Sequence, residues 1–326
     1  KYLGLLGVSS RVLMATPQSA MRITSYNVLA QCYVRSVQFP HSPSASLKWK
    51  ARSKTLIAEL ATLDSDVLAM QEVDNYNDFW APWLKTRGYS GAWKCRTSLT
   101  ANKKDGCGVF YKVSKYDLLA TREIEYNDIA FGRPVGYVAD AMDTGGHVPA
   151  SGASKGAAQP LVTGIAPPPM VGEKAQAHVR DCVGVLTLLR AKPNASTASS
   201  AAAAAAAAAV DGDADTSALA AAATAALASR VVLVASTHLF WDPQYADVKL
   251  AQADRLLAEA GHFLSDHADV IAAAGGGPAA VVIAGDFNSV PGSEVHMRML
   301  RGIDGGWGDD SGAGEDGGDV VRGRGA

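Results

Sequence analysis

The chain has 326 residues, which at roughly 100–200 residues per domain allows one large domain or two ordinary ones. Its 30 basic and 32 acidic residues leave a net charge of −2, so no chain-wide positive field favours nucleic acid or an anionic membrane. The sequence lacks the uncharged apolar stretch of roughly 18 residues that a membrane-spanning helix needs, so we expect a soluble protein with no membrane partner.

Hydrophobic patterns in the first half of the chain predict alternating strands and helices. A strand over 21–29 precedes a helix over 47–63, in which Trp49, Leu56, Leu60 and Leu63 follow helical spacing. The run DVLAMQE over 66–72 is typical of a buried strand, and a helix over 75–87 ends at Gly88. Further strands are expected over 89–95, 108–112 and 116–125.

The second half contains two strong strand signals, over 182–189 and 231–238. A helix is expected to begin with Asp242 as its N-cap and Pro243 in its first position, and to run to about residue 268. Leu250, Leu257 and Leu264 are one heptad apart and should lie on one face of this helix. The run AAVVIAG over 279–285 then predicts a buried strand.

Four segments carry little hydrophobic periodicity: 1–20, 140–178, 191–229 and 305–326. We therefore expect one domain over 21–304, with surface insertions at about 140–178 and 191–229 that have no catalytic role. Residues 1–20 are interpreted as disordered or as a targeting remnant, and 305–326 as a Gly- and Asp-rich tail.

The cysteines are scattered along the chain as Cys32, Cys95, Cys107 and Cys182. They form neither a CxxC pair nor a His/Cys group at zinc spacing. We expect reduced, buried thiols with no disulfide partner.

Polar residues lie at the ends of four predicted strands or directly beyond them: Asn27, Glu72, His238, and the pair Asp286 and Asn288. In layered α/β folds, ligands bind at the carboxyl ends of strands, so these side chains are expected to meet in one crevice. Carboxylates and amides are hard oxygen ligands suited to Mg²⁺ or Mn²⁺, the usual equipment for phosphoryl transfer. Taken singly, Asn27 and His238 are better explained as structural residues, and only their joint occurrence favours a site.

The motifs SYNVLAQ (25–31), DVLAMQEVD (66–74), KKDGCGVFYK (103–112), STHLFWDP (236–243), DVKLAQ (247–252) and GDFNSVPGS (285–293) resemble the endonuclease/exonuclease/phosphatase superfamily. Within it, they are most similar to the carbon catabolite repressor-type deadenylases and to nocturnin. The resemblance implies a layered α/β sandwich, in which two packed mixed β-sheets are flanked by helices. It also implies Mg²⁺-dependent hydrolysis of phosphodiester bonds, with Mn²⁺ as an alternative metal.

The resemblance also implies roles for the residues at the strand ends. Glu72 matches the metal-binding glutamate, and Asn27 matches the asparagine that helps to hold the scissile phosphate. His238 matches the histidine that stabilises the phosphoryl transition state. Asp286 and Asn288 match the pair that orients the attacking water and assists the metal centre.

Two further residues match substrate-binding positions of these relatives. Pro243 corresponds to a residue that packs against the substrate adenine, and Arg96 to a basic residue near a substrate phosphate. The residues around these positions agree with substrate binding, because they include a local basic cluster and two aromatic side chains on which a base could stack. A solvated loop is the simpler interpretation of the basic cluster. These residues are Lys94, Arg96, Lys103 and Lys104, with Trp93 and Phe240.

The sequence departs from the family pattern after Ser293. Family members carry a later aspartate, typically in an Asp-Tyr-Ile-Phe strand, and a C-terminal Ser-Asp-His element, and neither occurs there. The run Ser265, Asp266 and His267 precedes GDFN and falls in the predicted helix, so we interpret it as a coincidence. We expect the sequence to be a fragment of a longer enzyme, truncated at its C-terminus, and the alternative is a chain that has lost catalysis.

The function expected from this resemblance is Mg²⁺-dependent 3′–5′ exoribonuclease activity on the poly(A) tails of mRNA. Its partners would be RNA and subunits of a deadenylation complex, in the cytoplasm or nucleus, with a mitochondrion or chloroplast as the alternative compartment. Two other functions stay open. One is a nocturnin-like phosphatase that removes the 2′-phosphate of NADP(H), and the other is a catalytically silent RNA-binding fragment.

Overall fold

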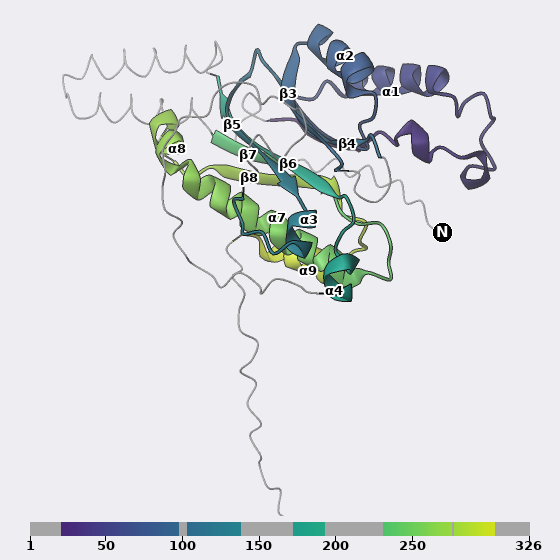
Figure 1. The fold of residues 1–326 in the computed structure, drawn as a ribbon. Coiled ribbons are helices and arrows are strands. Elements are labelled where there is room, and N and C mark those ends of the chain that lie inside the picture. Colours follow the sequence, from purple (N-terminus) through teal and green to yellow (C-terminus); the bar gives the residue numbers. More distant parts are fainter. Residues whose placement is uncertain (1–20, 98–102, 138–171, 193–230, 276, 304–326) are drawn as a thin grey trace, which may run out of the picture.

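The computed structural model describes residues 21–97, 103–137, 172–192, 231–275 and 277–303 (Figure 1). The expectations for 1–20 and 305–326, and for most of the two insertions, lie outside the described residues. Residues 172–178, at the end of the first insertion, do belong to the described structure and form the short helix α4. Within the described residues, no helix combines the length and apolar content needed to cross a membrane.

The described strands form two four-stranded mixed sheets. The first sheet has the order β1-β2-β4-β3, with β1 (Ile23–Asn27), β2 (Val67–Gln71), β4 (Gly106–Lys112) and β3 (Tyr89–Cys95). The second has the order β5-β6-β7-β8, with β5 (Tyr116–Glu125), β6 (Val183–Ala191), β7 (Val231–His238) and β8 (Ala280–Asp286). The expected α/β sandwich with two mixed sheets is confirmed.

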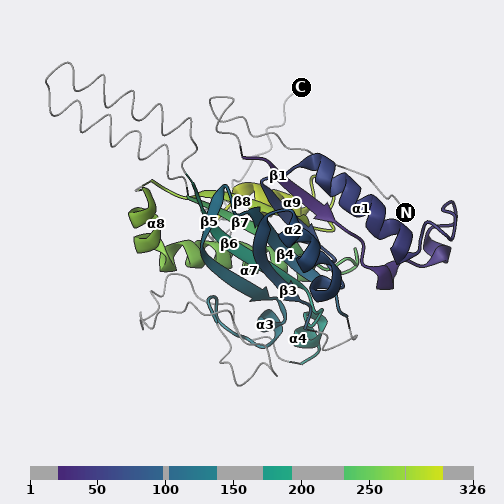
Figure 2. The same ribbon diagram turned by 90° about the horizontal axis from the view of Figure 1, so that it is seen from above.

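Helices cover the outer faces of both sheets (Figure 1). The first sheet is covered by α1 (Trp49–Leu63), the π-helical turn η3 (Tyr76–Trp80) and α2 (Ala81–Thr86). The second is covered by α7 (Ala246–Asp266), α8 (Ala268–Gly275) and α9 (Glu294–Arg301). Shorter elements are η1 (Gln31–Tyr33), η2 (Ser36–Gln38), α3 (Asn127–Ala130) and α4 (Glu173–Ala177). The second view looks down on these layers, with β1 beside α1 (Figure 2).

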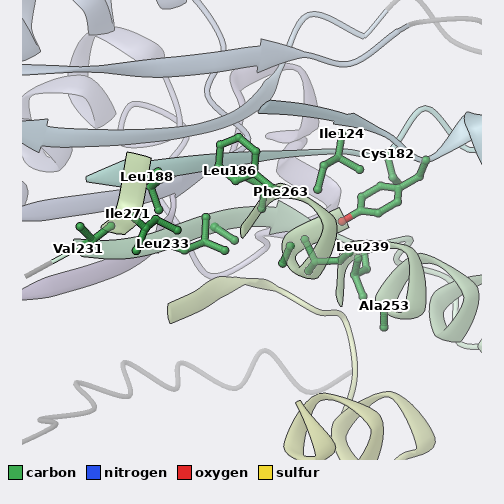
Figure 3. Packing of buried hydrophobic residues seen from close by; sticks show 14 of the residues in the cluster. Ile124, Cys182, Leu186, Leu188, Val231, Leu233, Leu239, Ala253, Phe263 and Ile271 are labelled. Atoms are coloured by element: carbon green, nitrogen blue, oxygen red, sulfur yellow. The ribbon is translucent and has the colours of Figure 1, made fainter. Parts of the chain in front are cut away.

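Three buried clusters fill the spaces between the four layers. One lies between the two sheets and includes Val67, Val109 and Val234. A second, with Trp80 and Phe110, lies under α1 and α2. The third lies between the second sheet and α7, and its members are Ile124, Cys182, Leu186, Leu188, Val231, Leu233, Leu239, Ala253, Phe263 and Ile271, among others (Figure 3). Because both faces of β2 and β7 are covered, these strands are buried along their whole length.

Each sheet contains one parallel pair of strands, and these two pairs determine where the site lies. β1 and β2 are parallel, with Asn27 opposite Gln71 at their carboxyl ends. β7 and β8 are parallel, with His238 opposite Asp286. The carboxyl ends of the two parallel pairs meet at one edge of the sandwich, because Asn27 of β1 hydrogen-bonds across to Asp286 of β8.

Several elements differ from the sequence prediction. The helix expected over 75–87 is split into η3 and α2, and Asn75 has left-handed backbone angles (φ 48°). The helix expected from Asp242 begins only at Ala246, with Tyr245 as its N-cap residue. Helices α3, α4, α8 and α9 were not predicted. The strand expected to be buried over 279–285 is β8, which is exposed or half-buried because it lies at the edge of its sheet. Among the cysteines, Cys107 and Cys182 are buried as expected, whereas Cys95 is half-buried and Cys32 is exposed.

A polar link joins the two sheets inside the core, directly before the strands end. The hydroxyl of Ser236 accepts a hydrogen bond from Gln71 Nε2 at 3.1 Å and donates one to the carbonyl of Met70 at 3.0 Å. Gln71 and Ser236 precede Glu72 and the Thr237–His238 end of β7, so this link sets the spacing of the two sheets at the site.

Replacing Ser236 with alanine is expected to lower the free energy of unfolding by about 1–3 kcal/mol, because a buried amide donor and a buried carbonyl each lose a partner. Urea unfolding followed by tryptophan fluorescence measures this. The control is Thr62→Ala on the exposed side of α1, where a change within about 0.5 kcal/mol is expected. Equal stability of the two variants would contradict the proposed link.

Candidate active site

The structure brings four of the predicted site residues together at the edge of the sandwich; we call Asn27, Glu72, His238 and Asp286 the strand-end cluster. Asn27 Nδ2 donates to Glu72 Oε1 at 2.8 Å and to Asp286 Oδ2 at 3.1 Å. His238 Nδ1 lies 4.0 Å from Glu72 Oε1, and His238 Nε2 lies 3.8 Å from Asp286 Oδ2. Each residue comes from a different strand or its end, two from each sheet.

Glu72 is the most buried carboxylate of the cluster, and its backbone has a left-handed conformation (φ 55°). For a residue other than glycine this conformation is uncommon and costs of order 1 kcal/mol, so the surrounding structure must impose it. Its Oε2 accepts a hydrogen bond from the backbone of Ala30 at 2.9 Å. Burial raises the pKa of Glu72, and the hydrogen bonds from Asn27 and Ala30 act in the opposite direction.

The loop after β1 is held in place by Arg52 of α1, which the sequence analysis did not single out. Its Nη2 donates to the carbonyls of Val28 and Leu29 at 2.8 and 2.6 Å. This fixes the loop so that the amide of Ala30 reaches Glu72. Arg52 lies in a helix, 24 residues after Val28 and 23 after Leu29. No pattern in the sequence of the loop indicates this contact.

His238 is buried between the cluster and a basic residue behind it. Burial lowers the pKa of His238 to about 4, and the positive charge of Arg96 acts in the same direction. The imidazole is therefore neutral near pH 7. Arg96 Nη2 lies 2.9 Å from His238 Nδ1.

Arg96 itself lies behind the cluster, with a side chain that is only 6% exposed. Its Nε donates to Asp105 Oδ2 at 2.8 Å, and its Nη1 donates to the carbonyl of Asp181 at 3.2 Å. The resemblance implies that Arg96 contacts a substrate phosphate, whereas here its guanidinium binds protein groups. Asp105 is part of the KKDGCGVFYK motif, yet sequence reasoning assigned it no role.

Asp286 and Asn288 are joined through the chain turn after β8. Asp286 Oδ1 accepts from the backbone of Asn288 at 3.0 Å, and the Asn288 amide donates to the carbonyl of Leu239 at 2.9 Å. Asn288 also has a left-handed backbone (φ 47°). Gly285 is required just before, because a Cβ there would lie 2.3 Å from the carbonyl of Thr237. The close approach of β8 to β7 therefore brings Asp286 beside His238.

The segment between β7 and α7 starts directly after His238 and turns at residues 243–244, where the Tyr245 amide donates to the carbonyl of Asp242. Gln252 Oε1 accepts from the backbone of Phe240 at 2.9 Å, and the Arg180 guanidinium lies over the rings of Phe240 and Tyr245 at 4.9 and 4.7 Å. Pro243 is exposed, as is the neighbouring Trp241 at 64%.

Trp93, expected as a stacking surface for a base, instead stacks on Tyr76 with ring centroids 4.6 Å apart. Its indole nitrogen donates to the carbonyl of Val73. The Ser265–His267 run lies at the end of α7, where Asp266 pairs with Arg122. These residues therefore do not belong to the strand-end cluster.

The donor set of the strand-end cluster is compatible with a hard divalent cation. Among the described residues, no group of three or more His, Cys, Asp or Glu side chains is placed to hold a metal ion. Glu72 is nevertheless a buried carboxylate whose pKa is raised by burial, and Asp286 lies across the cluster from it. A cation at Glu72 would compensate this buried charge, and Mg²⁺ commonly binds through one or two carboxylates while keeping several waters.

Two curated proteins show what this chain is similar to. Carbon catabolite repressor protein 4 homolog 4 of Arabidopsis thaliana is 34% identical over 285 residues, which are 86% of this chain and 56% of that protein. The CCR4-Not complex 3′-5′-exoribonuclease subunit Ccr4 of Schizosaccharomyces pombe is 25% identical over 303 residues, or 86% of this chain and 34% of that protein. The chain thus spans about half the length of the first relative and about a third of the second.

The fold is also found in a solved structure, the human Nocturnin catalytic domain with a bound sulfate anion. The TM-score is 0.51 at 17% identity, over 87% of this chain and 70% of that one. The sequence model of the Endonuclease/Exonuclease/phosphatase family matches residues 24–319, which include every residue of the strand-end cluster. The chain therefore belongs to the Endonuclease/Exonuclease/phosphatase family, as the resemblance of its motifs predicts.

Proposed function

We propose that this chain carries the catalytic domain, over about 21–304, of a metal-dependent 3′–5′ exoribonuclease that shortens poly(A) tails. The observation that carries the proposal is the strand-end cluster, in which two carboxylates, an amide and a neutral imidazole from four strands meet. The printed name of the Schizosaccharomyces pombe relative, a 3′-5′-exoribonuclease subunit of the CCR4-Not complex, supports the substrate class. The same name supports RNA and subunits of such a complex as partners, whereas the cytoplasm or nucleus stays a prediction.

The residues of the cluster suit the hydrolysis of a phosphodiester. Glu72 would hold Mg²⁺, or Mn²⁺ in its place, and the bound ion would supply neutralisation of charge on the phosphoryl oxygens. Asn27 would donate to a phosphoryl oxygen through Nδ2, because its Oδ1 accepts from the Leu29 amide; in this structure Nδ2 donates to Glu72 and Asp286. His238 adds a second donor beside it.

Asp286 would orient the attacking water. Its side chain is 35% exposed, so water reaches it, and its Oδ1 is fixed by the Asn288 amide. The water oxygen would bond to phosphorus as one of its protons passes to Asp286, the bond from phosphorus to the 3′-oxygen of the preceding nucleotide would break, and that oxygen would take a proton from solvent. This releases 5′-AMP from a poly(A) end. Pro243 and Trp241, which are exposed and follow His238 closely in the chain, would contact the terminal adenine.

The test is the product formed by the full chain from a 5′-labelled oligoadenylate in Mg²⁺. We expect stepwise shortening with release of 5′-AMP, and slower shortening of oligocytidylate of equal length. Phosphate release from NADPH, measured in parallel, distinguishes a 2′-phosphatase. Faster turnover of NADPH than of oligoadenylate, or oligoadenylate binding without turnover, would overturn the proposed activity.

A further inference from the structure

A chain of buried polar groups runs from the loop after β1 to the imidazole of His238; we call it the Tyr33–His238 chain. The hydroxyl of Tyr33 donates to Asp105 Oδ1 at 2.8 Å. Asp105 Oδ2 accepts from Arg96 Nε at 2.8 Å, and Arg96 Nη2 lies 2.9 Å from His238 Nδ1. Asp105 and Arg96 are both buried, so the carboxylate and the guanidinium are held by each other.

The contact between Arg96 and His238 specifies which imidazole nitrogen carries the proton. A guanidinium in a protein is always charged and can only donate. His238 Nδ1 must therefore accept this hydrogen bond, which leaves its lone pair occupied and places the ring proton on Nε2. An imidazolium, with a proton on each nitrogen, would direct Nδ1–H at a donor.

Arg96 has little freedom to leave this position. Its Nε is bound to Asp105, its Nη1 to the carbonyl of Asp181, and its Nη2 to His238. To reach a substrate phosphate, the guanidinium would leave a fully buried carboxylate without its charge partner, which typically costs several kcal/mol. The geometry favours a role through His238 over direct contact with the substrate.

The opposite nitrogen of the ring faces the cluster. His238 Nε2 lies 3.8 Å from Asp286 Oδ2, too far for a direct hydrogen bond and on the side where Asp286 is open to solvent. We propose that Arg96, held by Asp105 and Tyr33, is a positioning residue that keeps His238 as the Nε2–H tautomer, so that the imidazole donates to a phosphoryl oxygen and does not act as a general base. This inference rests on the proposed function for the identity of the phosphate ligand.

The tautomer can be measured directly in the full chain. Long-range ¹H–¹⁵N correlation spectra of protein labelled at its seven histidines distinguish a nitrogen that carries a proton from one that accepts. A His238→Asn variant assigns the His238 signals. We expect an accepting Nδ1 and a protonated Nε2 at neutral pH. A protonated Nδ1 in the wild-type spectrum would overturn the proposal, whether or not the chain hydrolyses RNA.

Variants then test whether Arg96 sets this tautomer. The pair Arg96→Met with Asp105→Asn removes the donor without leaving a buried carboxylate unpaired, and should give a mixture of both tautomers. Arg96→Lys keeps one donor and should restore part of the wild-type signal. The matched control is Arg122→Met, because Arg122 binds Glu259 and Asp266 on α7, away from His238. An unchanged tautomer in the double variant would overturn the role of Arg96.

If the wild-type chain hydrolyses oligoadenylate, its kcat and KM give a second test of the role of Arg96. The double variant should lower kcat by about 10²-fold, the effect of losing one well-aimed donor to a developing negative charge, with KM changed less than about threefold. A loss confined to KM would instead indicate direct substrate binding by Arg96 and would overturn the positioning role. Absence of hydrolysis in the wild-type chain would contradict only the proposed function, since the spectra decide the tautomer independently.

Discussion

Replacing Glu72 with glutamine is expected to abolish hydrolysis of oligoadenylate, with a loss of at least about 10³-fold in kcat. The amide keeps the size of the side chain, and its single oxygen can accept from either Asn27 Nδ2 or the Ala30 amide but not from both, so we expect the fold to be preserved with one hydrogen bond fewer. What it lacks is the negative charge that would hold a divalent ion. Such an ion contributes several kcal/mol to phosphoryl transfer, and each 1.4 kcal/mol or so is a factor of ten in rate.

Two measurements check this result. Single-turnover hydrolysis at saturating Mg²⁺ gives the loss in rate, and calorimetric titration with Mn²⁺ reports metal binding without any substrate. The control is Glu294→Gln, which removes an exposed carboxylate at the start of α9. Glu72→Gln protein that binds Mn²⁺ as tightly as the control would contradict the proposed metal role, even if its activity were lost.

Replacing Phe263 with alanine is expected to lower the free energy of unfolding by about 3–5 kcal/mol, the range typical of large aromatic residues removed from a core. Phe263 is 1% exposed and lies between α7 and the second sheet (Figure 3). Its ring also packs against His267 and lies under the Arg122 guanidinium, with centroid distances of 4.5 and 5.0 Å.

Urea unfolding followed by far-ultraviolet circular dichroism measures this effect. Leu300→Ala is the matched control, because Leu300 lies in α9 with 68% of its surface exposed and should change stability by less than about 0.5 kcal/mol. A Phe263→Ala variant that lost under about 1 kcal/mol would show that the packing of α7 on the second sheet differs from the one described here.

The sequence predicts the strands of this fold better than its helix ends. The predicted ranges 89–95, 116–125 and 231–238 coincide with β3, β5 and β7. β7 is buried along its whole length and its apolar run is a local signal, whereas β3 and β5 are only partly buried and are indicated by their β-favouring residues and by the turns that bound them. The start of α7 is different. Asp242 and Pro243 have the chemistry of a helix start, but Gln252 holds the Phe240 amide, and the packing of Arg180 on Phe240 and Tyr245 fixes the segment before the helix. Tertiary contacts override the local preference.

In the candidate site, too, sequence patterns identify the residues at the strand ends but not the residues that contact them from distant parts of the chain. The four members of the strand-end cluster could be selected because each follows a recognisable strand. The residues behind them could not be selected in this way. Arg96 is 142 residues from His238 in sequence, and Arg52 reaches its carbonyls from a helix, so neither role leaves a local pattern. The short helix α9 had one available signal, the Ser293 side chain that accepts from the His296 amide as an N-cap.

The hydrogen bond from Asn27 to Asp286 joins residues 259 positions apart in the chain. During synthesis, Asn27 and Glu72 emerge first, and their partners on β7 and β8 follow only after most of the domain has left the ribosome. The nascent chain therefore has no assembled cluster until its last described strand pairs with β7. A chain whose synthesis stops before residue 280 lacks that strand, so any nuclease activity would report that synthesis and folding have passed this point.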